Sequence, residues 1–193
     1  MLVLLLGLIL FLGVHSIAIL NNAWREQMIA RFGEMPWKVA YGLVALLGLV
    51  LIVIGYGEAR ESPLVLYTMP VWMRHVALLI MLPVFPLLFA AYLPGRIQSA
   101  TKHPMLVGVK LWAVAHLLAN GTLADVLLFG GFLVWAVADR ISLKRRPQPS
   151  VPGAPPGKRN DLIALGLGLV FYVAFILFLH RWLFGVSPIA MGG

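Results

Sequence analysis

The stretch 102-KHPMLVGVKLWAVAHLLANG-121 contains an apolar run of helical length that carries the polar side chains Lys110, His116 and Asn120. An apolar run of this kind is typical of a helix that lies in a lipid bilayer. Ionisable side chains are costly in hydrocarbon, so they normally face the interior of a helical bundle and mark functional sites. The stretch therefore predicts an inner membrane helix that carries candidate functional residues.

The composition of the whole chain agrees with this prediction. Of its 193 residues, 61% are hydrophobic and 11% are charged, whereas a soluble domain is about 45–50% apolar and about 25% charged. The absence of cysteine excludes disulfides, iron–sulfur clusters, thiolate zinc sites and covalently attached haem. The net charge is +8, but the basic residues lie mostly between the apolar segments. They therefore indicate anionic lipid headgroups as the partner, and no nucleic acid.

Six segments approach the roughly 20 residues that a membrane span requires. We therefore predict an all-α integral membrane bundle of about six transmembrane helices. The predicted spans are Leu2–Leu20, Val39–Tyr56, Val76–Leu93, Pro104–Ala119, Leu123–Ala138 and Leu162–Phe184.

The loops predict the domain organisation and the orientation in the membrane. Residues 1–145 form a core of five spans, residues 146–160 a linker rich in proline and glycine, and residues 161–193 the sixth span with a tail. Most of the 15 lysines and arginines follow spans one, three and five, so those loops are predicted to be cytoplasmic. Both termini then face the periplasm of a bacterial inner membrane.

Two histidines, His15 and His116, lie within the apolar interior of predicted spans, away from the interfacial ends. Two inward imidazoles on different helices can hold a haem iron between them, one on each face. The alternative is that each is a neutral histidine that only forms hydrogen bonds within the bundle. His75 is a further candidate ligand, because its depth in the membrane is close to that of His116.

Lys110 also has two interpretations. Its long side chain can reach the cytoplasmic boundary, or pair there with Asp139, and so have a structural role. Alternatively, it can meet an anionic partner such as a haem propionate.

Several stretches resemble the NnrU family of membrane proteins. The resemblance covers about residues 1–145 and is most specific from Lys102 to Gly121. The matching stretches are 11-FLGVHS-16, 54-IGYGEAR-60, 66-LYTMPVWMRH-75, 91-AYLPGRI-97, 102-KHPMLVGVKLWAVAHLLANG-121 and 129-FGGFLVWAVADRIS-142.

The resemblance implies a function and a ligand set. The family is associated with denitrification, that is, with nitrite and nitric oxide reduction, and it is related to the ζ-carotene isomerase, a membrane enzyme that binds haem b. By resemblance, His116 is one iron ligand and His15 the second, with His75 replacing His15 if the two depths do not match. Asn120 or a backbone carbonyl would orient the other ring nitrogen of His116.

Three functional hypotheses follow from these observations. The first is a haem b protein of the NnrU type, linked to nitrite and nitric oxide metabolism. The second is a haem-dependent cis–trans isomerase of a carotene, which would make the chain an enzyme with a hydrophobic substrate. The third is a non-catalytic membrane accessory protein that partners denitrification proteins. No catalytic residue can be assigned from the sequence.

Overall fold

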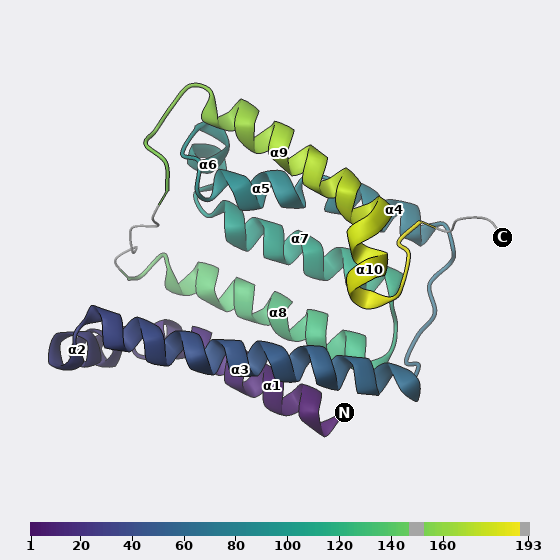
Figure 1. Cartoon of the computed structure of the whole chain (residues 1–193), viewed down its shortest axis with the longest axis horizontal. Coiled ribbons are helices and arrows are strands. Elements are labelled where there is room, and N and C mark those ends of the chain that lie inside the picture. Colours follow the sequence, from purple (N-terminus) through teal and green to yellow (C-terminus); the bar gives the residue numbers. More distant parts are fainter. Residues whose placement is uncertain (147–152, 190–193) are drawn as a thin grey trace. The chain divides into compact units, whose positions relative to one another are not determined.

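A computed structural model describes residues 1–146 and 153–189 (Figure 1). The regular secondary structure of this part of the chain is helical, and its only β-type contact is an isolated bridge between Val65 and Thr122. The all-α prediction is therefore confirmed for the described residues. The chain divides into two compact units, which are described separately.

The first unit contains residues 1–68 and 120–148. Helix α1 packs along α3, and α8 packs on α1 and also contacts α3. The short helix α2 connects α1 to α3. The bounds are α1 Leu2–Leu20, α2 Asn22–Phe32, α3 Glu34–Glu61 and α8 Leu123–Ser142.

Glycine allows α1 and α3 to approach each other closely. A Cβ atom added at Gly7 would lie 2.5 Å from the backbone nitrogen of Ile52, and one added at Gly48 would lie 2.7 Å from that of Phe11. Helices in a bilayer gain little from the hydrophobic effect when they associate, so close backbone contact between small residues has to supply the packing. The glycine positions therefore determine how this pair of helices fits together.

The second unit contains residues 69–119 and 149–193. Helix α5 contacts both α7 and α9, and α4 contacts α7 (Figure 1). The Tyr172 hydroxyl of α9 donates to the carbonyl of Leu78 in α4 at 2.9 Å. The bounds are α4 Met73–Met81, α5 Val84–Ala90, α6 Arg96–Thr101, α7 Pro104–Ala119, α9 Asn160–Ala174, the π-helical turn η1 Phe175–Leu179 and α10 His180–Phe184.

The predicted linker, residues 146–160, falls partly on residues 147–152, which lie outside the described residues. The part that is described contacts the second unit: the Ala154 amide donates to the Tyr92 carbonyl at 2.9 Å. At the start of α9, the carboxylate of Asp161 accepts from the amides of Arg96 and Ile97 at 2.8 and 3.0 Å. Asp161 thereby satisfies two amides of the first turn of α6, which have no acceptor within that helix.

Two of the six predicted spans, Leu2–Leu20 and Pro104–Ala119, have the bounds observed for α1 and α7. The third span is divided between α4 and α5 at Pro83, because proline has no amide hydrogen to donate and its ring displaces the preceding turn. The second span extends as a helix beyond both predicted ends, to Glu34 and Glu61.

Four helical segments of the described chain are long and apolar enough to cross a membrane, namely Leu2–Leu20, Glu34–Glu61, Met73–Ala90 and Asn160–Phe184. Helix α7 is apolar but has only 16 residues. Helix α8 has 20 residues but carries Asp125, Asp139 and Arg140 near its ends. By length and composition, four of the six predicted spans are supported, and six remains a prediction.

Two glycine substitutions in α3 test the packing of α1 on α3. Gly48→Ala places a methyl group against the backbone of Phe11, so we expect the free energy of unfolding to fall by about 1–3 kcal/mol. Gly42→Ala is the matched control, because a Cβ there meets no atom within 4 Å. Thermal unfolding in detergent measures both. Equal stability of the two variants would contradict this view of the helix pair.

Candidate functional site

His15 lies in the last two turns of α1 and is half-buried. Its Nδ1 is 2.6 Å from the Phe11 carbonyl. Because a carbonyl can only accept, Nδ1 must carry the proton, and the lone pair of the neutral ring is then on Nε2. The ring stacks on Phe11 with centroids 4.2 Å apart and meets Tyr41 and Trp135 edge-on at 5.2 and 5.9 Å. Aromatic rings from α1, α3 and α8 thus fix its orientation.

A cavity of about 260 Å³ adjoins His15, between α1, α2 and α3. Ligand pockets usually measure about 300–1,000 Å³, so this cavity is too small to enclose a porphyrin. Its lining is partly apolar and partly charged: Val14, His15, Ile17, Ala18, Arg25, Ile29, Glu34, Trp37, Lys38 and Tyr41.

His116 lies in the last turn of α7 and is also half-buried. Its Nδ1 is 2.8 Å from the Trp112 carbonyl, and its ring is 5.3 Å from that of Trp112. The same reasoning therefore places the lone pair of the neutral ring on Nε2. A backbone carbonyl that holds Nδ1–H is the usual support for a histidine whose other nitrogen binds a metal.

The other residues proposed from the sequence are divided between the two units. His75 and Lys110 belong to the second unit with His116, whereas His15 and Asn120 belong to the first. Helix α7 runs antiparallel to α4 and α5, because Gly108 near its start faces Val84 and Leu88 of α5. His75 at the start of α4 and His116 at the end of α7 therefore lie at the same end of this helix group.

Asp125, which is only 4% exposed, is the centre of a polar cluster that was not expected from the sequence. The Tyr56 hydroxyl donates to Asp125 Oδ1 at 2.5 Å, and the backbone amide and hydroxyl of Thr122 donate to Oδ2 at 2.9 and 2.6 Å. Thr122 and Asp125 form the capping box that begins α8. The Thr-x-x-Asp spacing signals this cap, but nothing in the sequence indicates the partner Tyr56.

Tyr67, in the segment between α3 and α4, lies near this cluster. Loss of water contact raises the pKa of its phenol above the ordinary value, and the nearby Asp125 carboxylate raises it further. Both causes favour the neutral phenol, so Tyr67 is uncharged at neutral pH.

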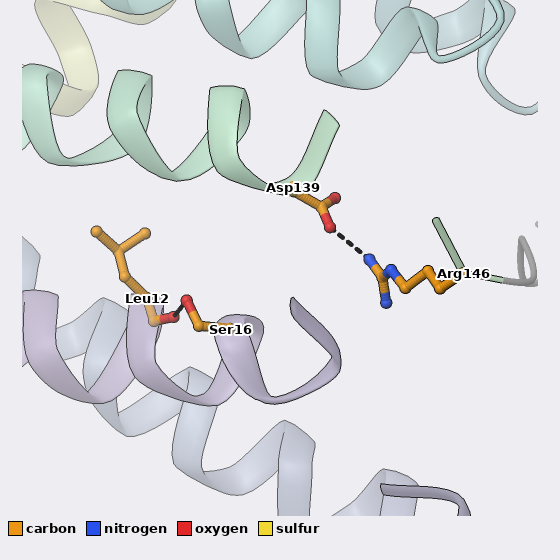
Figure 2. A network of polar contacts seen from close by, with 4 residues as sticks. All are labelled: Leu12, Ser16, Asp139 and Arg146. Carbon is orange, nitrogen blue, oxygen red and sulfur yellow. Dashed lines mark hydrogen bonds and ion pairs between the residues drawn. The ribbon is translucent and has the colours of Figure 1, made fainter. Parts of the chain in front are cut away.

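Asp139, in the last turn of α8, accepts a charge-assisted hydrogen bond from Arg146 (Figure 2). The side chain of Arg146 reaches back from the segment after α8 to make this ion pair. Asp139 was considered from the sequence as a partner for Lys110, and the partner that the structure gives it is Arg146. The nearby Ser16 hydroxyl donates to the Leu12 carbonyl one turn earlier in α1, at 2.6 Å (Figure 2).

In residues 1–146 and 153–189, no group of three or more histidine, aspartate or glutamate side chains is placed to hold a metal ion. The long apolar helices are those of an integral membrane protein. The chain belongs to the NnrU family, because the family model described as NnrU protein matches residues 3–188. The resemblance noted in the sequence is thereby confirmed and extends over the last span. No curated protein and no solved structure matches the chain.

Substitution of Tyr56 tests whether the Asp125 cluster stabilises the first unit. Tyr56→Phe removes the hydroxyl and leaves a buried carboxylate oxygen without its donor, so we expect a loss of about 1–3 kcal/mol in the free energy of unfolding. Tyr92→Phe is the control, since Tyr92 is 47% exposed. If thermal unfolding in detergent gives the same midpoint for both variants, the cluster has no stabilising role.

Proposed function

We propose that this protein is a haem b protein of the NnrU type that acts in nitrite and nitric oxide metabolism, with His116 as an iron ligand. The observation that carries the proposal is the hydrogen bond from His116 Nδ1–H to the Trp112 carbonyl. It orients the ring and places the lone pair of the neutral imidazole on Nε2, the nitrogen that would bind the iron. The family association with denitrification supplies the physiological context.

The second ligand in this proposal is His75. It lies in the same unit as His116 and at the same end of the antiparallel α4–α7 pair. Neutral imidazoles suit haem iron, so the donor types fit the group. His15, the second ligand expected from the sequence, remains the alternative. The small cavity beside His15 favours His75.

Lys110 is assigned a supporting role at this site. It is half-buried on α7 and lies six residues before His116. Its ammonium group would neutralise a carboxylate of the bound group, such as a propionate. Haem, when bound, supplies an iron that can change its oxidation state and bind small gaseous ligands. The protein contributes the imidazoles, the cation and the apolar surroundings.

We also propose that all six predicted spans cross the inner membrane and that both termini are periplasmic. Backbone hydrogen bonds from Leu66 to Gly121 and from Leu123 to Leu64, each 2.8 Å, tie the segment after α3 to the start of α8. The two segments must lie on the same side of the membrane. Helix α8 then runs back along α1, and Phe132 meets Phe11 with ring centroids 5.5 Å apart.

The length of α8 gives further support for six spans. Its first turn bonds to Tyr56 near the end of α3, and residues after its last turn line a cavity together with Asn22, which follows α1. Helix α8 thus extends along the length of the α1–α3 pair, and its charged residues lie near its two ends. Chain continuity then requires α7 to return to the side on which α8 begins.

Absorption spectra test haem binding. The purified protein is expected to show a Soret band, which His116→Ala abolishes because the ligand is lost, and which His180→Ala retains. His180 is the matched control, because its Nδ1 is also bonded to a backbone carbonyl, that of Val186. Parallel spectra of His75→Ala and His15→Ala identify the second ligand. A colourless, folded preparation would contradict the proposal and leave the accessory role.

Single cysteines test the topology, because the chain has none of its own. In spheroplasts, a membrane-impermeant maleimide is expected to label Glu61→Cys and Asn120→Cys but not Gln27→Cys. Lysis of the spheroplasts should make Gln27→Cys reactive. Protection of Asn120→Cys in intact spheroplasts would mean that α7 does not cross the membrane, and the six-span proposal would be wrong.

A further inference from the structure

A second cavity of the first unit, of about 440 Å³, lies where α1 and α8 end and α2 begins. We refer to it as the α1–α8 cavity. One side is apolar and is formed by Ala18 and Ile19 of α1 and by Ala138 and Ile141 of α8. These residues continue the apolar surfaces of two membrane helices, so this side of the cavity suits a hydrocarbon chain.

The other side of the α1–α8 cavity is polar and basic. It is formed by Asn22, Ser142, Arg145 and Arg146. Within the described residues, Arg145 is exposed and no carboxylate lies within ion-pair distance of it. The lining thus holds two cations, of which only Arg146 is paired.

Arg146 itself has an unused donor. Its Nη2 bonds to Asp139 (Figure 2), but its buried Nε has no acceptor among the described residues. A buried donor without a partner costs about 1–3 kcal/mol, so such a group normally has one in the functional protein. The missing partner must be a hydrogen-bond acceptor, and the surplus positive charge favours an anionic one.

The surroundings of the cavity have the features of a membrane boundary. Ala18 also lines the smaller cavity that contains Arg25 and Lys38. Trp37 lines this smaller cavity, and its ring centroid lies 5.8 Å from that of Trp24. Tryptophan is enriched where a bilayer meets water. Basic pockets between membrane helices at this level typically bind anionic lipid headgroups.

We propose that the α1–α8 cavity binds an anionic glycerophospholipid. Its phosphate oxygens accept hydrogen bonds from Arg145 and from Nε–H of Arg146, while Asp139 continues to hold Nη2. One acyl chain lies along Ala18 and Ile141 and extends toward the bilayer. Free phosphate has the same charge chemistry but would leave the apolar side of the cavity uncovered. The site is independent of the proposed haem.

Titration of the full-length protein with lipids, in dodecyl maltoside, tests whether it binds an anionic phospholipid. Thermal unfolding midpoints are measured with added phosphatidylglycerol, phosphatidylcholine or inorganic phosphate, each at the same concentrations. We expect phosphatidylglycerol alone to raise the midpoint, since it combines the anionic phosphate with the acyl chain. Equal stabilisation by phosphatidylcholine would overturn the requirement for net negative charge. Equal stabilisation by inorganic phosphate would overturn the assignment to a lipid.

Substitutions of neighbouring basic residues test whether Arg145 and Arg146 bind the lipid phosphate. Arg145→Gln is expected to weaken phosphatidylglycerol binding at least about tenfold, the loss typical of a charge-assisted hydrogen bond. Lys144→Gln is the matched control: it removes the same charge from an exposed position that does not line the cavity, so it should cost no more than about fivefold. Arg146→Lys, which keeps a cation for Asp139 but lacks Nε–H, should also weaken binding. Equal losses for Arg145→Gln and Lys144→Gln would indicate a diffuse basic surface and overturn the proposal.

Discussion

The high cost of an unsatisfied polar group in hydrocarbon is the constraint on which this structure depends. Inside the helices the constraint is met locally: Nδ1 of His15 bonds to Phe11 and the hydroxyl of Ser16 bonds to Leu12, each one turn earlier. Between helices it is met by the bond from Tyr56 to Asp125. The burial of these polar side chains therefore costs little free energy, and the hydrogen bond between helices also stabilises the first unit.

The same constraint connects the fold to the proposed chemistry. A histidine whose Nδ1 is held by its own helix presents Nε2 in a fixed direction, without needing a second residue to orient it. His116 has this arrangement on α7, and His75 lies at the same end of the adjacent helix. In the proposed site, haem iron would accept the lone pair of Nε2.

Much of the fold could be predicted from the sequence, because apolar length is a strong signal. The bounds of α1 and α7 follow directly from it, and Pro83 marks the break between α4 and α5. The partner of Asp125 could not be predicted, because Tyr56 is 69 residues away and its depth beside Asp125 depends on helix packing. The partner of Asp139 is local, but Arg146 appears in the sequence as one of several adjacent basic residues.

The central claim is the proposal that His116 would hold haem iron through Nε2 and that His75 would supply the second imidazole. Low-temperature electron paramagnetic resonance of the oxidised, purified protein tests it most directly. The claim predicts a low-spin ferric signal in the wild type and a high-spin signal in His75→Ala, where one of the two imidazole ligands would be lost. A wild-type protein without a ferric haem signal, or with the same signal in His116→Ala, would contradict the claim.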